Sequence, residues 1–97
     1  MKQTNFKVEI YFDPDAENLT DICKATDEIF SSFNMPCLDR KPASRIYGDN
    51  GDPKDFGRLY AAIGRVGDNP NILNSIFDGI FDRGDRRDTL MTSFFEH

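Results

Sequence analysis

Apolar and polar residues alternate without exception from Phe6 to Phe12. This period of two is typical of a β-strand that buries one face against a core. The residues predicted to face the core are Phe6, Val8, Ile10 and Phe12. Because every later apolar segment carries a stripe that could cover or extend this face, we expect residues 6–12 to form a central strand.

The following segment predicts an amphipathic helix over residues 17–33. Asp13 is of a type that caps the free N–H groups at a helix start, and Pro14 suits the first helical position. One stripe at helical spacing is apolar or small. It consists of Leu19, Ile22, Cys23, Thr26, Ile29, Phe30 and Phe33. Asn34-Met35-Pro36 would end the helix, and a connection would follow up to Ala43.

Two short strands joined by a hairpin are predicted next. Residues 44–47 would bury Ile46 and expose Arg45 and Tyr47. The turn-forming residues 48–55 suggest a hairpin loop. The partner strand would be residues 58–63, with Leu59, Ala61 and Ile63 facing inward and Arg58 and Tyr60 facing outward.

The last part of the chain predicts a second helix and a final strand. Asn69-Pro70 is again a capping residue followed by proline, and the apolar residues of 72–81 fill half of a helical wheel. Residues 83–85 would close this helix. Residues 89–95 would supply the last strand, in a register that the alternation leaves open between Leu90 with Phe94 and Met91 with Phe95.

The element order β-α-β-β-α-β predicts an α+β fold in one domain, residues 1–97. It is the order of the ferredoxin-like sandwich, in which a four-stranded antiparallel sheet carries two helices on one face. Ninety-seven residues are enough for one core. This fold hosts enzymes, ligand sensors and RNA binders, so it implies no function by itself.

Composition and charge narrow the function classes. The net charge is −5 and the isoelectric point about 4.7, which disfavours general binding to a nucleic-acid backbone. Cys23 and Cys37 have neither metal-ligand nor redox spacing, so we expect two reduced thiols. With no membrane-spanning run or signal segment in this sequence, we expect a cytoplasmic protein. The sequence contains no motif that predicts a catalytic pair, a metal site or a cofactor.

Carboxylates on the two predicted helices form the first candidate surface. In the expected fold the outer helix faces lie side by side, where only Lys24 would offset the negative charge. We call this set the acidic wall: Glu17, Asp21, Asp27, Glu28, Asp78 and Asp82. An acidic helix face can simply keep a protein in solution, or it can dock on a basic surface of another protein.

The uncovered sheet face is the second candidate surface. We call its predicted residues the tyrosine face: Lys7, Tyr11, Arg45, Tyr47, Arg58 and Tyr60. Tyrosines interleaved with bases could stack single-stranded RNA, as RNA-recognition motifs of this fold do, although the aromatic signature of those motifs is not reproduced. Tyr and Arg are equally enriched in protein interfaces, which would include a homodimer.

The leading functional expectation is a small acidic, non-enzymatic module that binds another protein. In size and charge the chain is similar to phage and mobile-element inhibitors of nucleic-acid enzymes, such as anti-restriction and anti-CRISPR proteins. That similarity implies an inhibitor or adaptor that docks on a basic, nucleic-acid-binding surface of its partner. The second interpretation is an RNA-binding domain that uses the tyrosine face, and the third is a small-ligand or enzymatic domain.

Overall fold

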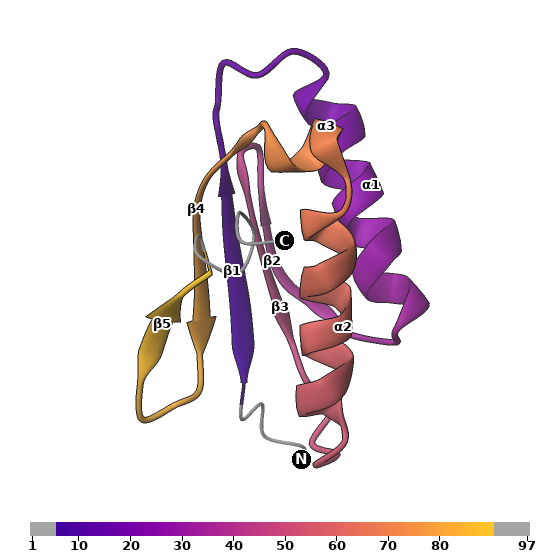
Figure 1. Ribbon diagram of the computed structural model, residues 1–97, viewed down its shortest axis with the longest axis vertical. Coiled ribbons are helices and arrows are strands. Elements are labelled where there is room, and N and C mark those ends of the chain that lie inside the picture. The colour runs from indigo at the N-terminus through magenta and orange to yellow at the C-terminus, as the bar shows by residue number, and fades with distance from the viewer. Residues whose placement is uncertain (1–5, 91–97) are drawn as a thin grey trace.

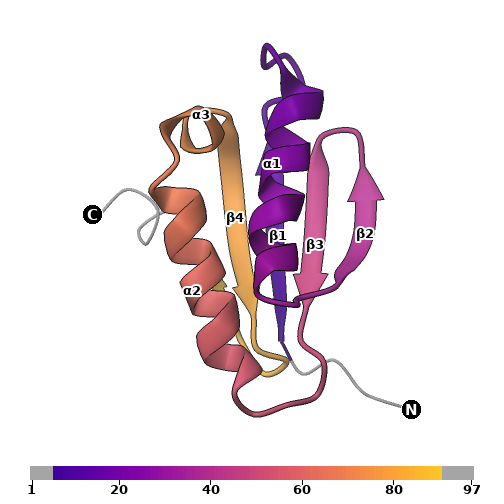
Figure 2. The same ribbon diagram turned by 90° about the vertical axis from the view of Figure 1, so that its right-hand side faces the viewer.

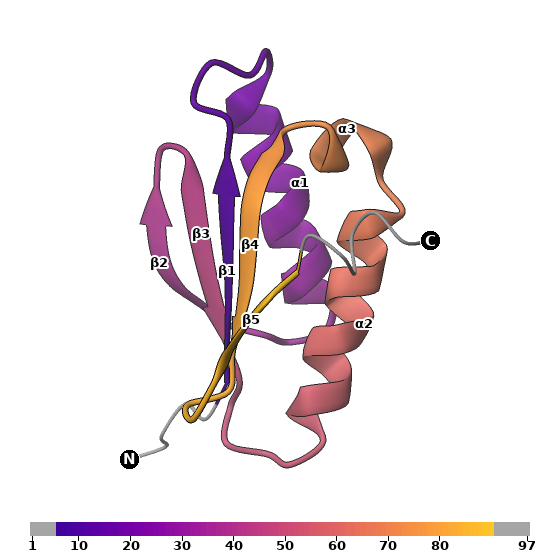
Figure 3. The ribbon, with the colours of Figure 1, turned by 60° about the vertical axis from the view of Figure 1, so that its left-hand side comes forward.

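The computed structural model describes residues 6–90, which form an α+β fold with a five-stranded antiparallel sheet and three helices. The strand order is β2-β3-β1-β4-β5. The strands are β1 (Lys7–Phe12), β2 (Cys37–Lys41), β3 (Ser44–Gly48), β4 (Ile76–Asp82) and β5 (Arg87–Thr89). The helices are α1 (Leu19–Ser32), α2 (Asp55–Gly67) and α3 (Pro70–Leu73). All three lie against one face of the sheet (Figures 1 and 2), and no helix of residues 6–90 covers the opposite face (Figure 3).

The central position predicted for residues 6–12 is confirmed. β1 pairs antiparallel with β3 on one side and with β4 on the other. Val8, Ile10 and Phe12 are fully buried on the helix-covered face, as the alternation requires. The core lies between this face and the helices, where the main contributions come from Ile22, Phe30, Leu59, Ile63, Val66, Ile72 and Phe81.

The first helix begins later than its sequence signals suggest. α1 starts at Leu19, and Asp13 does not cap it: the Asp13 carboxylate instead accepts a 2.9 Å hydrogen bond from the Asp15 N–H in a local turn. The residue before the helix is Asn18, whose φ of 59° is left-handed and whose side chain makes no capping hydrogen bond. An Asp-Pro start therefore produced a turn here, because aspartate stabilises turns as readily as helix ends.

The strand predicted at residues 58–63 is wrong, because that segment lies within helix α2. Leu59, Ala62, Ile63 and Val66 are buried at helical spacing, whereas Ala61 is exposed. The predicted alternation required Ala61 to face inward, but alanine is small enough to occur at both buried and exposed positions. Residues 48–55 consequently lead into a helix and do not close a hairpin.

The helix predicted at residues 72–81 is also wrong over most of its length. α3 ends at Leu73, and β4 follows from Ile76 to Asp82. Isoleucine and phenylalanine fit a pleated surface well, while the glycine and aspartates of this stretch are poor helix formers. Because pairs of apolar residues recur every four positions, the segment satisfied a helical wheel and was also usable as a strand.

The sheet is larger than the predicted four strands. Residues 37–41, predicted as a connection, form edge strand β2, which turns at Pro42-Ala43 into β3. At the other edge β5 covers residues 87–89, and Leu90 is buried with its N–H donating to the Gly79 carbonyl. The rest of the final strand predicted at residues 89–95 lies outside the described residues.

Candidate functional site

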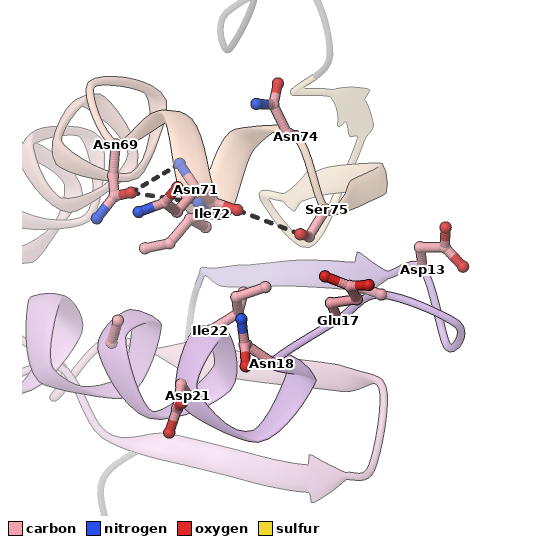
Figure 4. A pocket seen from close by; sticks show the side chains of 12 residues that line it. Asp13, Glu17, Asn18, Asp21, Ile22, Asn69, Asn71, Ile72, Asn74 and Ser75 are labelled. Atoms are coloured by element: carbon pink, nitrogen blue, oxygen red, sulfur yellow. Dashed lines mark hydrogen bonds between the residues drawn. The ribbon is translucent and has the colours of Figure 1, made fainter.

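A groove with a volume of about 670 Å³ lies between the start of α1 and helix α3. We call it the α1–α3 groove. Figure 4 shows Asn69, Asn71 and Ile72 on the α3 side facing Asn18 and Ile22 on the α1 side. The lining residues are Asp13, Ala16, Glu17, Asn18, Asp21, Ile22, Ala25, Asn69, Asn71, Ile72, Asn74 and Ser75.

Local sequence signals build the α3 wall of the groove. The Asn69 side chain accepts hydrogen bonds from the N–H groups of Asn71 at 3.0 Å and Ile72 at 3.2 Å, and Pro70 occupies the first helical position. The Ser75 hydroxyl donates to the Asn71 carbonyl at 3.2 Å. The predicted Asn-Pro start is therefore confirmed, although the helix that it begins is short.

A backbone hydrogen bond connects the two walls. The N–H of Asp13, directly after β1, donates at 2.7 Å to the carbonyl of Ser75, directly before β4. Both residues line the groove, so its base is fixed to the end of the central strand pair. The groove is thus anchored on paired backbone and not on loop side chains alone.

The lining combines three kinds of chemistry. Asp13, Glu17 and Asp21 bring exposed carboxylates, and four asparagines bring amide donors and acceptors. Ile22 and Ile72 are buried and supply an apolar base. Such a groove suits a cation carried on an aliphatic stem, since the stem contacts apolar surface while the charge reaches the carboxylates.

Carboxylates line the groove, whereas the ion-paired basic residues of 6–90 lie outside it. Within residues 6–90 the basic side chains that form ion pairs are Arg40, Lys41, Arg45, Arg58, Arg83, Arg86 and Arg87. No ion pair among the described residues involves Asp13, Glu17 or Asp21. The groove carboxylates therefore face solvent without an ion-paired cation from residues 6–90.

The structure divides the predicted acidic wall into three parts. Glu17, Asp21 and Glu28 are exposed at or on α1, as expected. Asp78 and Asp82 lie on β4, opposite Tyr11 and Lys7, and so belong to the uncovered sheet face and not to a helix. The predicted juxtaposition of two acidic helix faces is wrong, because the second helix was misplaced.

Asp27 leaves the acidic wall altogether. Its carboxylate accepts a 2.6 Å hydrogen bond from the Tyr47 hydroxyl and a 3.2 Å bond from Arg45 Nε, and Arg40 approaches it at 3.6 Å. These partners come from β2 and β3 on the helix-covered side. Asp27 is therefore a structural link between α1 and the sheet.

The predicted tyrosine face is not assembled. Register places Lys7 and Tyr11 on the uncovered face, but Arg45 and Tyr47 pair with Ile10 and Val8 and share their buried side. Burial and the Asp27 carboxylate raise the pKa of Tyr47 well above its usual value. Arg58 and Tyr60 lie on α2, where Arg58 pairs with Asp55 and the Tyr60 hydroxyl accepts a 3.0 Å bond from Arg83.

The uncovered face instead carries a polar network that the alternation did not indicate. Glu9 points away from the helices yet is only 7% exposed. The Glu9 carboxylate accepts a 2.7 Å hydrogen bond from the Tyr11 hydroxyl and forms a 2.8 Å ion pair with Arg87. Arg87 also donates a 3.0 Å hydrogen bond to the Asp82 carboxylate. The hydrogen bond to Glu9 and partial burial raise the pKa of Tyr11. Arg87 comes from β5, which begins two residues before the final strand predicted at residues 89–95.

Residues 6–90 contain no group of three or more His, Cys, Asp or Glu side chains placed to hold a metal ion. Cys23 and Cys37 are free thiols, and burial raises the pKa of each. None of the helices formed by residues 6–90 has the length and apolar character needed to cross a membrane.

Comparison with known proteins adds no relative: no protein-family model, curated protein or solved structure matches the chain. The site is therefore interpreted from its own geometry. Of the groove residues, Glu17 and Asp21 were predicted as partner-binding. Asp13, Ser75 and the asparagines were missed. For Asn69, Asn71, Asn74 and Ser75 the sequence signal was the run of polar residues within 69–75, which was assigned to a helix.

Proposed function

We propose that this protein is a small non-enzymatic binding module that docks on a basic segment of another protein. The binding surface is the α1–α3 groove with the adjoining exposed face of α1, which carries Glu28. The module acts as an inhibitor or adaptor, because a small domain that occupies a basic surface blocks or redirects what that surface normally binds.

One observation carries this proposal: within residues 6–90 the groove carboxylates form no ion pair, while most arginines form ion pairs elsewhere. Asp13, Glu17 and Asp21 are exposed and form no ion pair within residues 6–90. Unpaired charges of one sign in a concave site attract an oppositely charged partner and accelerate its association. A lysine or arginine side chain would place its stem over Ala16, Ala25 and Ile22 and its charge at this rim.

The asparagines favour a peptide over a free cation. An amide side chain offers both a donor and an acceptor, which are the groups that a peptide backbone can pair with. Asn71 and Asn74 are exposed beside the groove. A protein segment with several basic residues therefore fits better than an isolated ion.

The partner class that we favour is a protein whose basic surface normally holds nucleic acid. Such surfaces concentrate Lys and Arg, and a row of carboxylates can replace phosphates as their counter-charge. Direct RNA binding is not favoured, because Arg45 and Tyr47 lie on the helix-covered side and Arg58 and Tyr60 lie on α2. A cytoplasmic location accords with two free thiols.

We also propose that the fold is an extended ferredoxin-like sandwich. The order β2-β3-β1-β4, with α1 and α2 on one face, is that of the split β-α-β arrangement. α3 and β5 would then be additions. α3 supplies one wall of the groove, so the proposed binding surface depends on an addition and not on the shared core.

The test compares two charge reversals with the same net effect. Asp21→Lys changes the groove rim, whereas Asp85→Lys changes an exposed residue in the turn before β5. A fluorescent decalysine peptide serves as the probe, with binding measured by anisotropy at about 50 and 300 mM salt. We expect the wild type and Asp85→Lys to bind similarly at low salt and Asp21→Lys to bind at least several-fold more weakly.

Equal loss in both variants would mean that only net charge matters, and would contradict a docking site at the groove. A single-stranded RNA of matched length is titrated in parallel. We expect no saturable binding of that RNA, and sub-micromolar affinity would favour the RNA-binding interpretation instead.

A further inference from the structure

Phe77 is the most exposed large apolar side chain of residues 6–90, at 64%. It lies near the start of β4, where the register with β1 shifts: Phe12 is opposite Ile76 and Tyr11 is opposite Asp78. Phe77 is thus the extra residue of a β-bulge. Bulges turn a side chain out of the regular pleat, which accounts for an aromatic ring that projects into solvent.

Tyr11 forms a platform beside this ring. The Tyr11 and Phe77 ring centroids are 6.4 Å apart, with the planes tilted by 57°. The Tyr11 hydroxyl is held by Glu9, and Glu9 is held by Arg87. The orientation of Tyr11 is therefore fixed before any partner arrives, which lowers the entropy cost of binding on it.

The backbone of the aromatic pair adjoins the α1–α3 groove, while the Tyr11 side chain faces the uncovered side of the sheet, away from the helices. Tyr11 precedes groove residue Asp13 by two positions, and Phe77 follows groove residue Ser75 by two. An extended chain rises about 3.3 Å per residue, so each aromatic Cα lies within roughly 7 Å of a groove residue. The backbone bond between Asp13 and Ser75 holds these two short paths together at one end of the sheet.

We propose that the docking surface continues from the groove over this end of the sheet to Phe77 and Tyr11. The occupant is a segment of a partner protein that carries a large apolar side chain beside its lysines or arginines. This inference rests on the proposed function and specifies its partner. The carboxylates accelerate encounter, while the aromatic pair supplies the apolar anchor on which interface affinity usually depends.

Two synthetic peptides test this combination. Both are twelve residues long and lysine-rich; one contains a single central Phe, and the other has Ala at that position. Binding is followed by ¹⁵N–¹H NMR titration of the full chain, which also locates the contact. We expect the Phe peptide to bind about five-fold to ten-fold more tightly than the Ala peptide, with shifts at residues 11–13 and 75–78.

Phe77→Ala should abolish the preference for the Phe peptide while retaining the affinity for the Ala peptide. Leu38→Ala is the matched control, because Leu38 is also an exposed apolar residue, at 45%, but lies on edge strand β2. It should leave the preference unchanged. The NMR spectrum of each variant reports whether it is folded.

The outcomes separate this inference from the proposed function. If both peptides bind equally, or if Phe77→Ala keeps the preference, the aromatic extension is wrong and the groove proposal stands. If neither peptide binds, the proposed function fails and this inference fails with it.

Discussion

The hydroxyl of Tyr47 donates a 2.6 Å hydrogen bond to the carboxylate of Asp27, joining strand β3 to helix α1. The Tyr47 ring also stacks on Phe30, with parallel planes and centroids 3.9 Å apart. The sequence predicts that Tyr47 and Asp27 both face solvent. Their contact explains why α1 sits above β3, and it removes one member from each predicted surface.

Tyr47→Phe should destabilise the fold by about 1–3 kcal/mol, because the partly buried Asp27 carboxylate loses a donor while the ring stacking is retained. The measurement is the free energy of unfolding in urea. Tyr60→Phe is the control and should change stability less. Tyr60 is 39% exposed, and its hydroxyl accepts a hydrogen bond from Arg83 at the surface. Equal stability of wild type and Tyr47→Phe would contradict the assigned role of this hydrogen bond.

The surface of β1 offers a direct check of its register. Ile10→Asp would bury an unpaired charge at a site with no exposure, and should cost several kcal/mol of a total near 5–15. Lys7 is exposed and points to the opposite face of β1, three positions before Ile10, so Lys7→Asp should change stability much less. Thermal melts followed by circular dichroism compare the two. Similar midpoints would mean that the assigned faces of β1 are wrong.

β1 could be predicted because one face of this strand is buried throughout and its residues alternate strictly. β3 could not, although it was correctly expected to be a strand. Hydropathy favours turning Ile46 toward the core and Arg45 and Tyr47 away from it, yet in the structure Arg45 and Tyr47 face the helices and the half-buried Ile46 faces the other side. The buried side of β3 depends on Asp27 and Phe30, distant residues that neutralise the arginine and stack on the tyrosine. Local pattern contains no information on such partners.

Part of the α1 wall of the candidate groove could be predicted from the sequence. Glu17 and Asp21 are exposed in any arrangement that buries the apolar stripe of α1, so they could be assigned from periodicity. The α3 wall required the boundary between α3 and β4 to be known. The apolar residues of 72–81 fit a helical period, but Ile and Phe also favour strands. Pairing with β1 makes residues 76–82 a strand.

Asp55 makes a pH-dependent contribution to stability. Its side chain is fully buried, which alone would raise its pKa. Hydrogen bonds from the Asn50 N–H at 2.7 Å, from Arg58 and from the Asp52 N–H outweigh burial, so the pKa of Asp55 is lowered. A lowered folded-state pKa stabilises the fold above the unfolded-state value of about 3.9, and this contribution is lost as pH falls below it.

Asp55→Asn should therefore be less stable than the wild type at pH 7, by about 1–3 kcal/mol, and the difference should shrink as pH falls below about 4. Urea unfolding at several pH values measures this. Asp85→Asn, in an exposed turn, should follow the wild-type pH profile. A constant difference between Asp55→Asn and wild type from pH 7 to pH 3 would show that ionisation of Asp55 is not the cause.

The uncovered sheet face can be tested through the titration of Tyr11. The Glu9 carboxylate accepts a hydrogen bond from the Tyr11 hydroxyl and disfavours a second negative charge beside it, which raises the pKa of Tyr11. Glu9→Gln removes that charge, so the pKa of Tyr11 should move down toward its ordinary value of about 10. ¹³C-labelled tyrosine resolves the individual rings by NMR as pH is raised.

Asp82→Asn is the control for this titration, because Asp82 shares Arg87 with Glu9 and makes no hydrogen bond to Tyr11 among those seen in residues 6–90. It should lower the pKa of Tyr11 less than Glu9→Gln does. A raised folded-state pKa also means that Tyr11 stabilises the fold below pH 10 and loses this contribution as pH rises further. Tyr11→Phe should therefore show a shallower loss of stability above pH 10. If Glu9→Gln left the pKa of Tyr11 unchanged, the polar network would not hold this ring, and Tyr11 would not be a fixed platform beside Phe77.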